Sequence, residues 1–293
     1  QVSWGSVNLY NGTITGFTTS YGAGVAVEPR SSGSFGLYGN AAIQYNKSTN
    51  TGNLMQGGNY YPNSDLEDVS GKSSAGGGGV ANLGQFTMNS LRSDAIAYNS
   101  AARFGGGLYS YSEGDWYTDR WTKLLNGGIT GNTAGTQGGG IYNTAKADDS
   151  VYDTRDKKIT LYPTRGSRIT VTGNTVNGAA NNLATTQCIV LDREYGTSTT
   201  LLSTGSKIGV TVLEPANDKD VATINSKSNH YNTGAMVNDI PRFTLDDDNN
   251  GQMELGANSG GATYIHLTIY HKHTLCNLDS ASHDISVAGH SGE

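Results

Sequence analysis

The chain has 293 residues, of which 41 are Gly and 17 are Tyr, and only 15% are charged. The net charge of −6 argues against binding to nucleic acid, which requires a basic stripe. The chain has no run of about 18 apolar residues, so no transmembrane helix is predicted. Low charge and little Pro argue against disorder, whereas abundant Gly, Asn, Thr and Tyr favour an all-β protein with short strands and tight turns.

A short motif recurs along the chain: an apolar residue, two small or polar residues, and Asn. It reads IQYN at 43–46, IAYN at 96–99, ITGN at 129–132 and VTGN at 171–174, with a degenerate ITGF at 14–17. Six residues after the Asn, two copies begin a glycine run, at Gly105 and Gly138. Leu108, Ile141 and Leu183 each lie 12 residues after the apolar residue of their motif.

Each cycle of this repeat predicts three short strands. From Val80, apolar residues follow at Phe86, Met88, Ile96 and Leu108, which closes a cycle in 28 residues. Gly and β-branched residues disfavour helix, and short strands that stack on those of the next cycle make a parallel β-helix, with cycles about 4.8 Å apart. We expect two inward columns and Asn stacked on Asn, and the alternative is a β-sandwich. The columns would be Ile43, Ile96, Ile129 and Val171, and Leu108, Ile141 and Leu183.

The pairing of ITGN with GGGIY resembles the FxxN and GGA[I/V] repeats of chlamydial polymorphic outer-membrane proteins. It is more similar still to the repeats of large surface proteins of gut Firmicutes, and ITVTGNTVNGAANN at 169–182 is similar to the segment that precedes their C-terminal part. The resemblance covers residues 76–215 well and the first 60 weakly. It implies an all-β, right-handed parallel β-helix of the pectate-lyase type over residues 1–265, on an extracellular, adhesive protein of the bacterial cell surface. It supplies no catalytic motif.

Three stretches interrupt the repeat and are expected to form lateral loops, at about residues 47–75, 110–125 and 144–167. The last two follow the same strand of successive cycles, so they should emerge side by side. Aromatic rings beside carboxylates and Arg suit a glycan. The candidate ligand-binding residues are Asp115, Trp116, Tyr117, Asp119, Arg120, Trp121, Asp149, Asp153 and Arg155. The alternatives are a private hydrophobic cluster for the Trp residues and a solvated charged loop for 144–167.

Two segments contain candidate metal ligands. The sequence DDDNNG at 246–251 resembles the start of a calcium loop, with Asp246, Asp248 and Asn250 as ligands. A hairpin turn is the favoured alternative, because the motif lies between FTL and QMEL. Residues 266–293 are expected to be a His-rich tail or the start of a following segment. His271, His273, Cys276 and His283 offer four donors for a structural Zn²⁺. Exposed His side chains and a Cys188–Cys276 disulfide are the alternatives.

Three functions from different classes follow. The favoured one is a binding module of a bacterial surface adhesin that recognises a glycan, or a host or microbial surface protein, through its loops. The second is a polysaccharide lyase or glycoside hydrolase, which would need convergent carboxyls or a metal with a base; no such motif is evident, and we expect no enzyme. The third is a passive spacer. No secretion signal opens the chain, so we expect a fragment of a longer protein.

Overall fold

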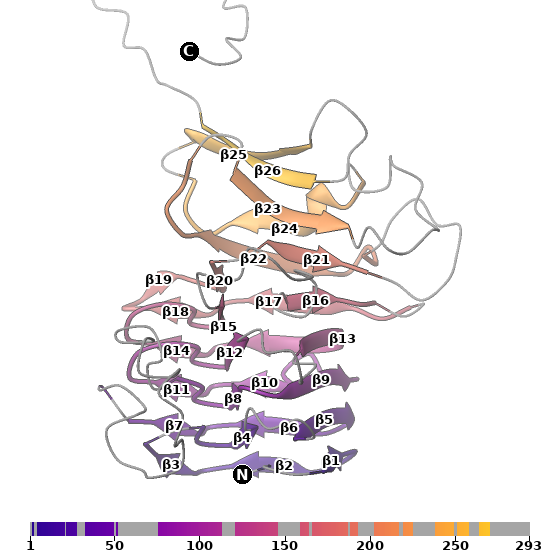
Figure 1. Ribbon diagram of the computed structural model, residues 1–293, viewed down its shortest axis with the longest axis vertical. Helices are drawn as coiled ribbons and strands as arrows, with labels where there is room; N and C mark the ends of the chain where they lie inside the picture. The colour runs from indigo at the N-terminus through magenta and orange to yellow at the C-terminus, as the bar shows by residue number, and fades with distance from the viewer. Residues whose placement is uncertain are drawn as a thin grey trace, which may run out of the picture.

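The computed structural model describes residues 2, 5–20, 22–27, 33–49, 51, 76–112, 121–145, 159–163, 166–186, 188–192, 202–216, 219–224, 238–248, 251–257 and 264–269. The protein is all-β: the described elements are strands apart from one 3-10 helix, η3 (Ile240–Arg242). The strands stack along one long axis, from β1, β2 and β3 near the N-terminus to β25 and β26 at the opposite end (Figure 1).

The strands form parallel ladders that the chain visits in the same order in each cycle. The first ladder contains β4 (Val25–Val27), β8 (Val80–Asn82), β12 (Leu108–Ser112), β15 (Ile141–Ala145) and β20 (Leu183–Thr185). The second contains β1 (Ser6–Leu9), β5 (Ser34–Gly39), β9 (Gln85–Ser90), the first half of β13 (Trp121–Thr130), β16 (Ile159–Leu161), β21 (Ile189–Leu191) and β23 (Lys219–Ile224).

The third ladder contains β2 (Thr13–Thr15), β6 (Ala42–Gln44), β10 (Ile96–Ala97), the second half of β13 and β17 (Ile169–Thr172). The first and third ladders both continue into β22 (Lys207–Val212) and then β24 (Phe243–Leu245). The fourth ladder forms a separate sheet of two-residue strands. Its parallel strands are β3 (Thr18–Thr19), β7 (Lys47–Ser48), β11 (Ser100–Ala101), β14 (Thr133–Ala134) and β18 (Thr175–Val176), and β19 (Ala179–Ala180) pairs antiparallel with β18.

The two predicted inward columns are confirmed. Ile43, Ile96, Ile129 and Val171 pair in register through the third ladder, and all four are fully buried. Leu108, Ile141 and Leu183 pair in register through the first ladder and are also fully buried. A further column in the second ladder consists of Leu37, Met88, Leu124, Leu161 and Leu191. Because neighbouring cycles cover each side chain, a few apolar residues per cycle suffice for a continuous core.

The glycine runs are required by the backbone. Gly77, Gly105 and Gly138 occupy equivalent positions and have φ of 78°, 61° and 64°, which glycine adopts without the clash of a Cβ. The glycines that follow allow the next cycle to approach closely: a Cβ on Gly79 would lie 2.6 Å from the carbonyl oxygen of Gly107. Substitution there would force the two cycles apart.

An asparagine ladder connects the cycles beside the third sheet ladder. The Asn99 amide group donates to the Oδ1 of Asn132 at 3.0 Å and to the Ile43 carbonyl oxygen at 2.9 Å, and the Asn99 backbone N–H also donates to that Oδ1. The same arrangement repeats along Asn46, Asn99, Asn132, Asn174 and Asn182 and ends at the carboxylate of Asp246. The predicted stacking of Asn on Asn is therefore confirmed.

Two features differ from the sequence expectation. The described cycles contain a fourth strand, whereas the sequence predicted three. The fourth strand was not predicted because a strand of two residues has no detectable apolar period. Parallel pairing also ends before residue 265: β25 (Met253–Ala257) and β26 (Tyr264–Ile269) pair antiparallel with each other, and β26 pairs antiparallel with β23. Residues 270–293, most of the expected tail, lie outside the described residues.

Candidate functional site

The strands define where the expected loops begin and end. β12 extends to Ser112 and β13 begins at Trp121, so the segment between them is 113–120 rather than 110–125. β15 and β16 likewise bound 146–158, inside the expected 144–167, and β7 occupies the start of 47–75. Most of the candidate ligand-binding residues lie outside the described residues: Asp115, Trp116, Tyr117, Asp119, Arg120, Asp149, Asp153 and Arg155.

The strands that flank the segments 113–120 and 146–158 are paired. Ser112 is in register with Ala145 at the point where the segments begin, and Thr122 is in register with Ile159 just after they end. Both segments therefore leave one strand of the first ladder and return to the neighbouring strand of the second. The two insertions start and finish on adjacent cycles, as the repeat spacing predicts.

An aromatic cluster lies on the strands from which both segments start. The ring centroids of Tyr109 and Tyr142 are 6.1 Å apart, and those of Phe104 and Tyr142 are 4.7 Å apart. The Arg103 guanidinium lies 5.0 Å from the Phe104 centroid, as in a cation–π contact. Burial raises the pKa of Tyr109, and the nearby Tyr111 adds to that shift. These side chains form a second, smaller hydrophobic cluster outside the main core.

Trp121 is the one predicted ligand-binding residue whose surroundings are described. It belongs to the start of β13, not to a loop, and its backbone N–H donates to the Gly84 carbonyl oxygen at 3.2 Å. The indole is half-buried, and the Lys123 ammonium lies 4.4 Å from the ring centroid. Thr122 and Leu124 point inward and are buried, so Trp121 and Lys123 share the outward face of the strand. Trp121 is therefore the first residue of a paired strand, directly after segment 113–120.

Sequence reasoning missed two exposed tyrosines at the corner after the third ladder. Tyr45 and Tyr98 follow the paired strands β6 and β10, and their rings stack with centroids 5.0 Å apart and an interplanar angle of 16°. The two side chains are 61% and 49% exposed. A Cβ on Gly131, the equivalent residue of the next cycle, would lie 2.7 Å from Tyr98 Cε1, so the Tyr98 ring covers that glycine.

Both tyrosines adopt a backbone conformation that disfavours them. Their φ values are 56° and 57°, and the equivalent residues in other cycles, Gly16, Gly131 and Gly173, have φ of 80°, 66° and 69°. The left-handed region costs an L-residue about 1–2 kcal/mol, which glycine avoids. The stacked pair returns about 0.5–1.5 kcal/mol beyond the apolar area that its rings bury, so the stacking by itself does not offset the conformational cost of two tyrosines. The sequence contains one indication of this feature: IQYN and IAYN have Tyr at the position where ITGN and VTGN have Gly.

A charged turn fixes the chain next to Tyr45. Arg92 donates to Asp94 through Nε and Nη2 at 2.9 and 2.8 Å, and Gln44 Nε2 donates to Asp94 Oδ2 at 3.0 Å. The hydrogen bonds from Arg92 hold the pKa of the Asp94 carboxyl below its usual value, with Gln44 contributing. Gln44 also donates to the Asp94 carbonyl oxygen at 2.8 Å. The residue preceding Tyr45 is thus anchored to the next cycle.

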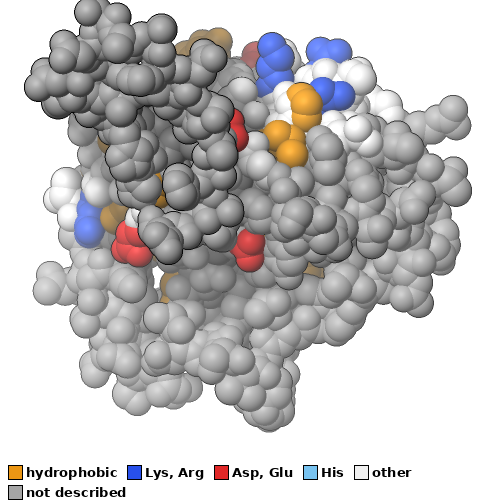
Figure 2. Space-filling model, turned by 90° about the horizontal axis from the view of Figure 1, so that it is seen from above, with side chains coloured by type: hydrophobic (Ala, Val, Ile, Leu, Met, Phe, Trp, Pro, Cys, Tyr) orange, Lys and Arg blue, Asp and Glu red, His pale blue; other side chains and the backbone are white. Residues whose placement is uncertain are grey.

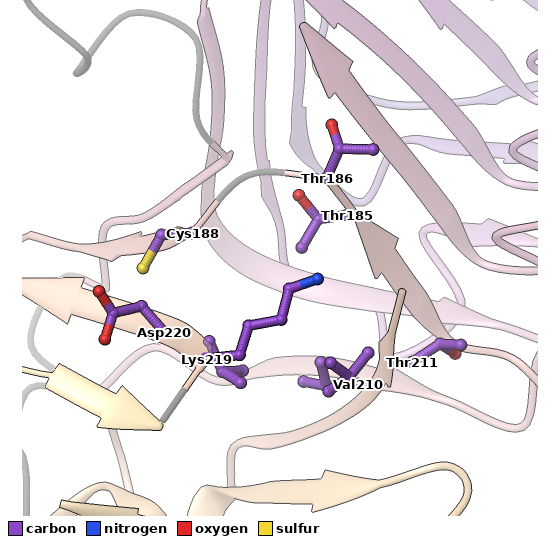
Figure 3. Close-up of a pocket in the computed structure, with 9 residues that line it drawn as sticks. Thr185, Thr186, Cys188, Val210, Thr211, Lys219 and Asp220 are labelled. Carbon is purple, nitrogen blue, oxygen red and sulfur yellow. The ribbon is translucent and has the colours of Figure 1, made fainter. Parts of the chain in front are cut away.

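A small pocket opens between β20, β22 and β23. Its volume is about 40 Å³, and its lining includes Thr185, Cys188, Thr211, Lys219 and Asp220. The Lys219 side chain extends across it (Figure 3), and the ammonium donates to the carbonyl oxygens of Leu213 and Glu214. A cavity needs about 10–15 Å³ of such space to hold one water, so this pocket has room for a few water molecules. It is too small for a sugar ring.

The metal predictions fall largely outside the described residues. His271, His273, Cys276, His283 and Asn250 are among the residues that the structure does not describe, so the zinc site and the Cys188–Cys276 disulfide stay predictions. Asp246 accepts hydrogen bonds from Asn182 and, at 2.7 Å, from Thr211 Oγ1, and Asp248 is exposed. Within the described ranges no three His, Cys, Asp or Glu side chains gather as metal ligands would. The calcium loop stays a prediction.

Charge is mixed at the C-terminal end of the stack. Seen from above, Lys and Arg side chains lie at the rim beside hydrophobic ones, and Asp and Glu side chains lie in separate places (Figure 2). In the part of the chain that the structure describes, no helix has the length and apolar character to span a bilayer.

Comparison with models of protein families, with curated proteins and with solved structures finds no match.

Proposed function

We propose that this chain is a binding module of an adhesin on the bacterial cell surface, folded as a right-handed parallel β-helix. Parallel ladders visited in a constant order, in-register aliphatic columns and a continuous asparagine ladder support this fold. The module recognises a glycan, or a host or microbial surface protein, through the insertions 113–120 and 146–158.

One observation carries this proposal: the strands on both sides of the two insertions are paired in register. Ser112 faces Ala145 where the insertions start, and Thr122 faces Ile159 after they finish. Two segments rich in Trp, Tyr, Asp and Arg are therefore presented from adjacent cycles. Side chains of these types commonly dominate recognition energy.

The alternatives gain less support. A retaining glycoside hydrolase needs two carboxyl groups about 5–5.5 Å apart in a groove that holds sugar rings. The described pocket is too small for that, and Asp220 is the one carboxylate among the residues that line it. A passive spacer gives no reason for an aromatic cluster of Tyr109, Tyr142 and Phe104 at the strands from which the insertions start.

The test is a glycan-array screen of the purified chain, with surface proteins as further probes. We expect Trp116→Ala to weaken binding at least tenfold, which is about 1.4 kcal/mol, and to leave thermal stability nearly unchanged. Asn99→Ala, in the asparagine ladder, should lower thermal stability and leave binding nearly unchanged. If Trp116→Ala lowers the melting temperature and leaves binding intact, the insertion is a packing element. A depolymerisation assay on mixed polysaccharides, run in parallel, would reveal the enzyme if unsaturated or reducing ends appear.

A further inference from the structure

We propose that Tyr45 and Tyr98 form a second glycan-binding site, separate from the insertions, that takes the sugar rings of a neutral polysaccharide. The two rings stack and are about half exposed or more, and they lie at one corner of successive cycles. They follow the third ladder, whereas the insertions connect the first ladder to the second. The site therefore has its own place on the molecule.

The first argument is conformational. Equivalent positions in three other cycles are occupied by glycine, in the same left-handed conformation that Tyr45 and Tyr98 are forced to adopt. Strained residues persist where the surrounding structure fixes them, and they concentrate at functional sites. Here the fixing contacts are present: the Tyr45 N–H donates to the Ala97 carbonyl oxygen at 3.3 Å, and Gln44 is tied to Asp94. Exposed rings kept against this strain indicate a role outside the fold.

The second argument is chemical. The C–H face of a pyranose ring packs on an aromatic ring, and polar groups beside the ring bind its hydroxyls. Lys47, Ser100 and Thr133 are aligned in successive cycles of the fourth ladder, each two residues after the tyrosine position, and supply such groups. Lys47 brings one positive charge to this row, whereas the charge of Arg92 is neutralised by Asp94 at 2.8 Å, and a single cation favours a neutral ligand over a polyanion.

The third argument is geometric. Cycles in a parallel stack repeat about every 4.8 Å, so equivalent side chains lie in a line along the stack. Because Tyr45 and Tyr98 stack on each other, a bound chain of sugars would contact the face of Tyr45 that Tyr98 does not cover and the exposed edges of both rings. The Tyr98 ring itself covers Gly131, and Gly173 in the cycle after that adds no side chain to the line.

The test is affinity electrophoresis of the full chain in gels that contain hydroxyethylcellulose, xylan or galactomannan. We expect at least one polymer to retard migration, and the double variant Tyr45→Gly, Tyr98→Gly to lose affinity at least tenfold. The same variant should melt at an unchanged or higher temperature, because glycine adopts this conformation without strain. Tyr45→Phe, Tyr98→Phe, which keeps both rings, should retain most of the affinity.

Tyr10→Ala is the matched control. Tyr10 stacks on Tyr38 at 5.3 Å and is also exposed, but its backbone conformation is ordinary, so its removal should leave migration unchanged. No retardation by any of the three polymers would overturn the proposal. So would retardation that survives the double glycine variant, or a marked loss of thermal stability in that variant. Because Trp116 lies in a different segment, the outcome of its substitution does not affect this test.

Discussion

At the scale of single residues, the molecule depends on positions where few residue types fit. The turn at Arg92 and Asp94 is one, because its ion pair is bidentate and also holds Gln44 of the preceding cycle. Tyr45 comes directly after Gln44, so the turn helps to hold the backbone of Tyr45 in its unfavourable left-handed conformation. A partly exposed ion pair of this kind contributes little to the free energy of unfolding by itself. Its role here comes from its position next to Gln44, which precedes Tyr45.

We predict that Asp94→Asn lowers the free energy of unfolding by about 0.5–1 kcal/mol at pH 7, the upper range for exposed pairs. The fold holds the pKa of this carboxyl below its unfolded value, so the stabilisation is present above that unfolded value of about 4. It is lost as the pH falls through the folded pKa. Urea unfolding of both proteins between pH 7 and pH 2 should therefore show the difference shrinking towards zero. Arg92→Gln should behave alike, and a pH-independent difference would contradict the assignment.

At the scale of elements, the asparagine ladder connects the cycles more tightly than the two-residue strands beside it. Asn99, Asn132 and Asn174 each donate to a buried backbone carbonyl oxygen of the preceding cycle, and the Oδ1 of each accepts two buried N–H groups. The ladder ends on the carboxylate of Asp246, a charged acceptor, which makes the last hydrogen bonds the strongest kind. Asn46, at the other end, accepts the backbone N–H of Phe17.

We predict that Asn99→Ala destabilises the protein by about 2–4 kcal/mol. The substitution leaves the Asn46 backbone N–H and the Ile43 carbonyl oxygen buried without these partners, and each such group costs about 1–3 kcal/mol. Denaturant unfolding measures the loss. Asn11→Ala, at an exposed site, serves as the control and should change stability by less than about 0.5 kcal/mol. Equal effects for the two variants would mean that the ladder contributes nothing.

At the scale of the whole molecule, one core runs through the stack from Val2 to Leu267. Among the described residues, the parallel ladders pair each cycle with the cycles on either side of it, so stability is roughly a sum of terms from cycles and from the interfaces between them. A residue in a central cycle takes part in two such interfaces. A residue in the first cycle takes part in one.

We predict that Ile129→Ala costs about 2–4 kcal/mol, because the side chain is fully buried between Ile96 and Val171. Ile14→Ala, in the first cycle and only partly buried, should cost clearly less. Thermal or urea unfolding compares the two. A similar loss at both sites would argue against a stack in which burial comes from the neighbouring cycles.

The sequence predicted the parts of the structure that repeat with a large residue. Ile96, Ile129, Leu108 and Ile141 recur at fixed spacing, and they form the columns. Ser100–Ala101 has no apolar period, so its ladder could not be recognised. Asp246 lies 64 residues from its partner Asn182, so its place at the end of the asparagine ladder could not be recognised from its short motif.

The candidate site was predicted less completely. The adjacency of the two insertions followed from the spacing, but the assignment of Trp121 to a loop did not hold, because TKL after it alternates as a strand does. Tyr45 and Tyr98 were grouped with the small and polar residues of the motif. Backbone torsion is not visible in a sequence, although Tyr in a glycine position was a hint.

The left-handed corner has a consequence for how such a protein can diversify. One backbone geometry accommodates a bare glycine at Gly131 and Gly173 and a large ring at Tyr45 and Tyr98. Substitution at one residue per cycle therefore alters the outer surface, while the aliphatic columns and the asparagine ladder inside stay the same. The surface chemistry of related chains can diverge at these corners faster than the fold that carries them.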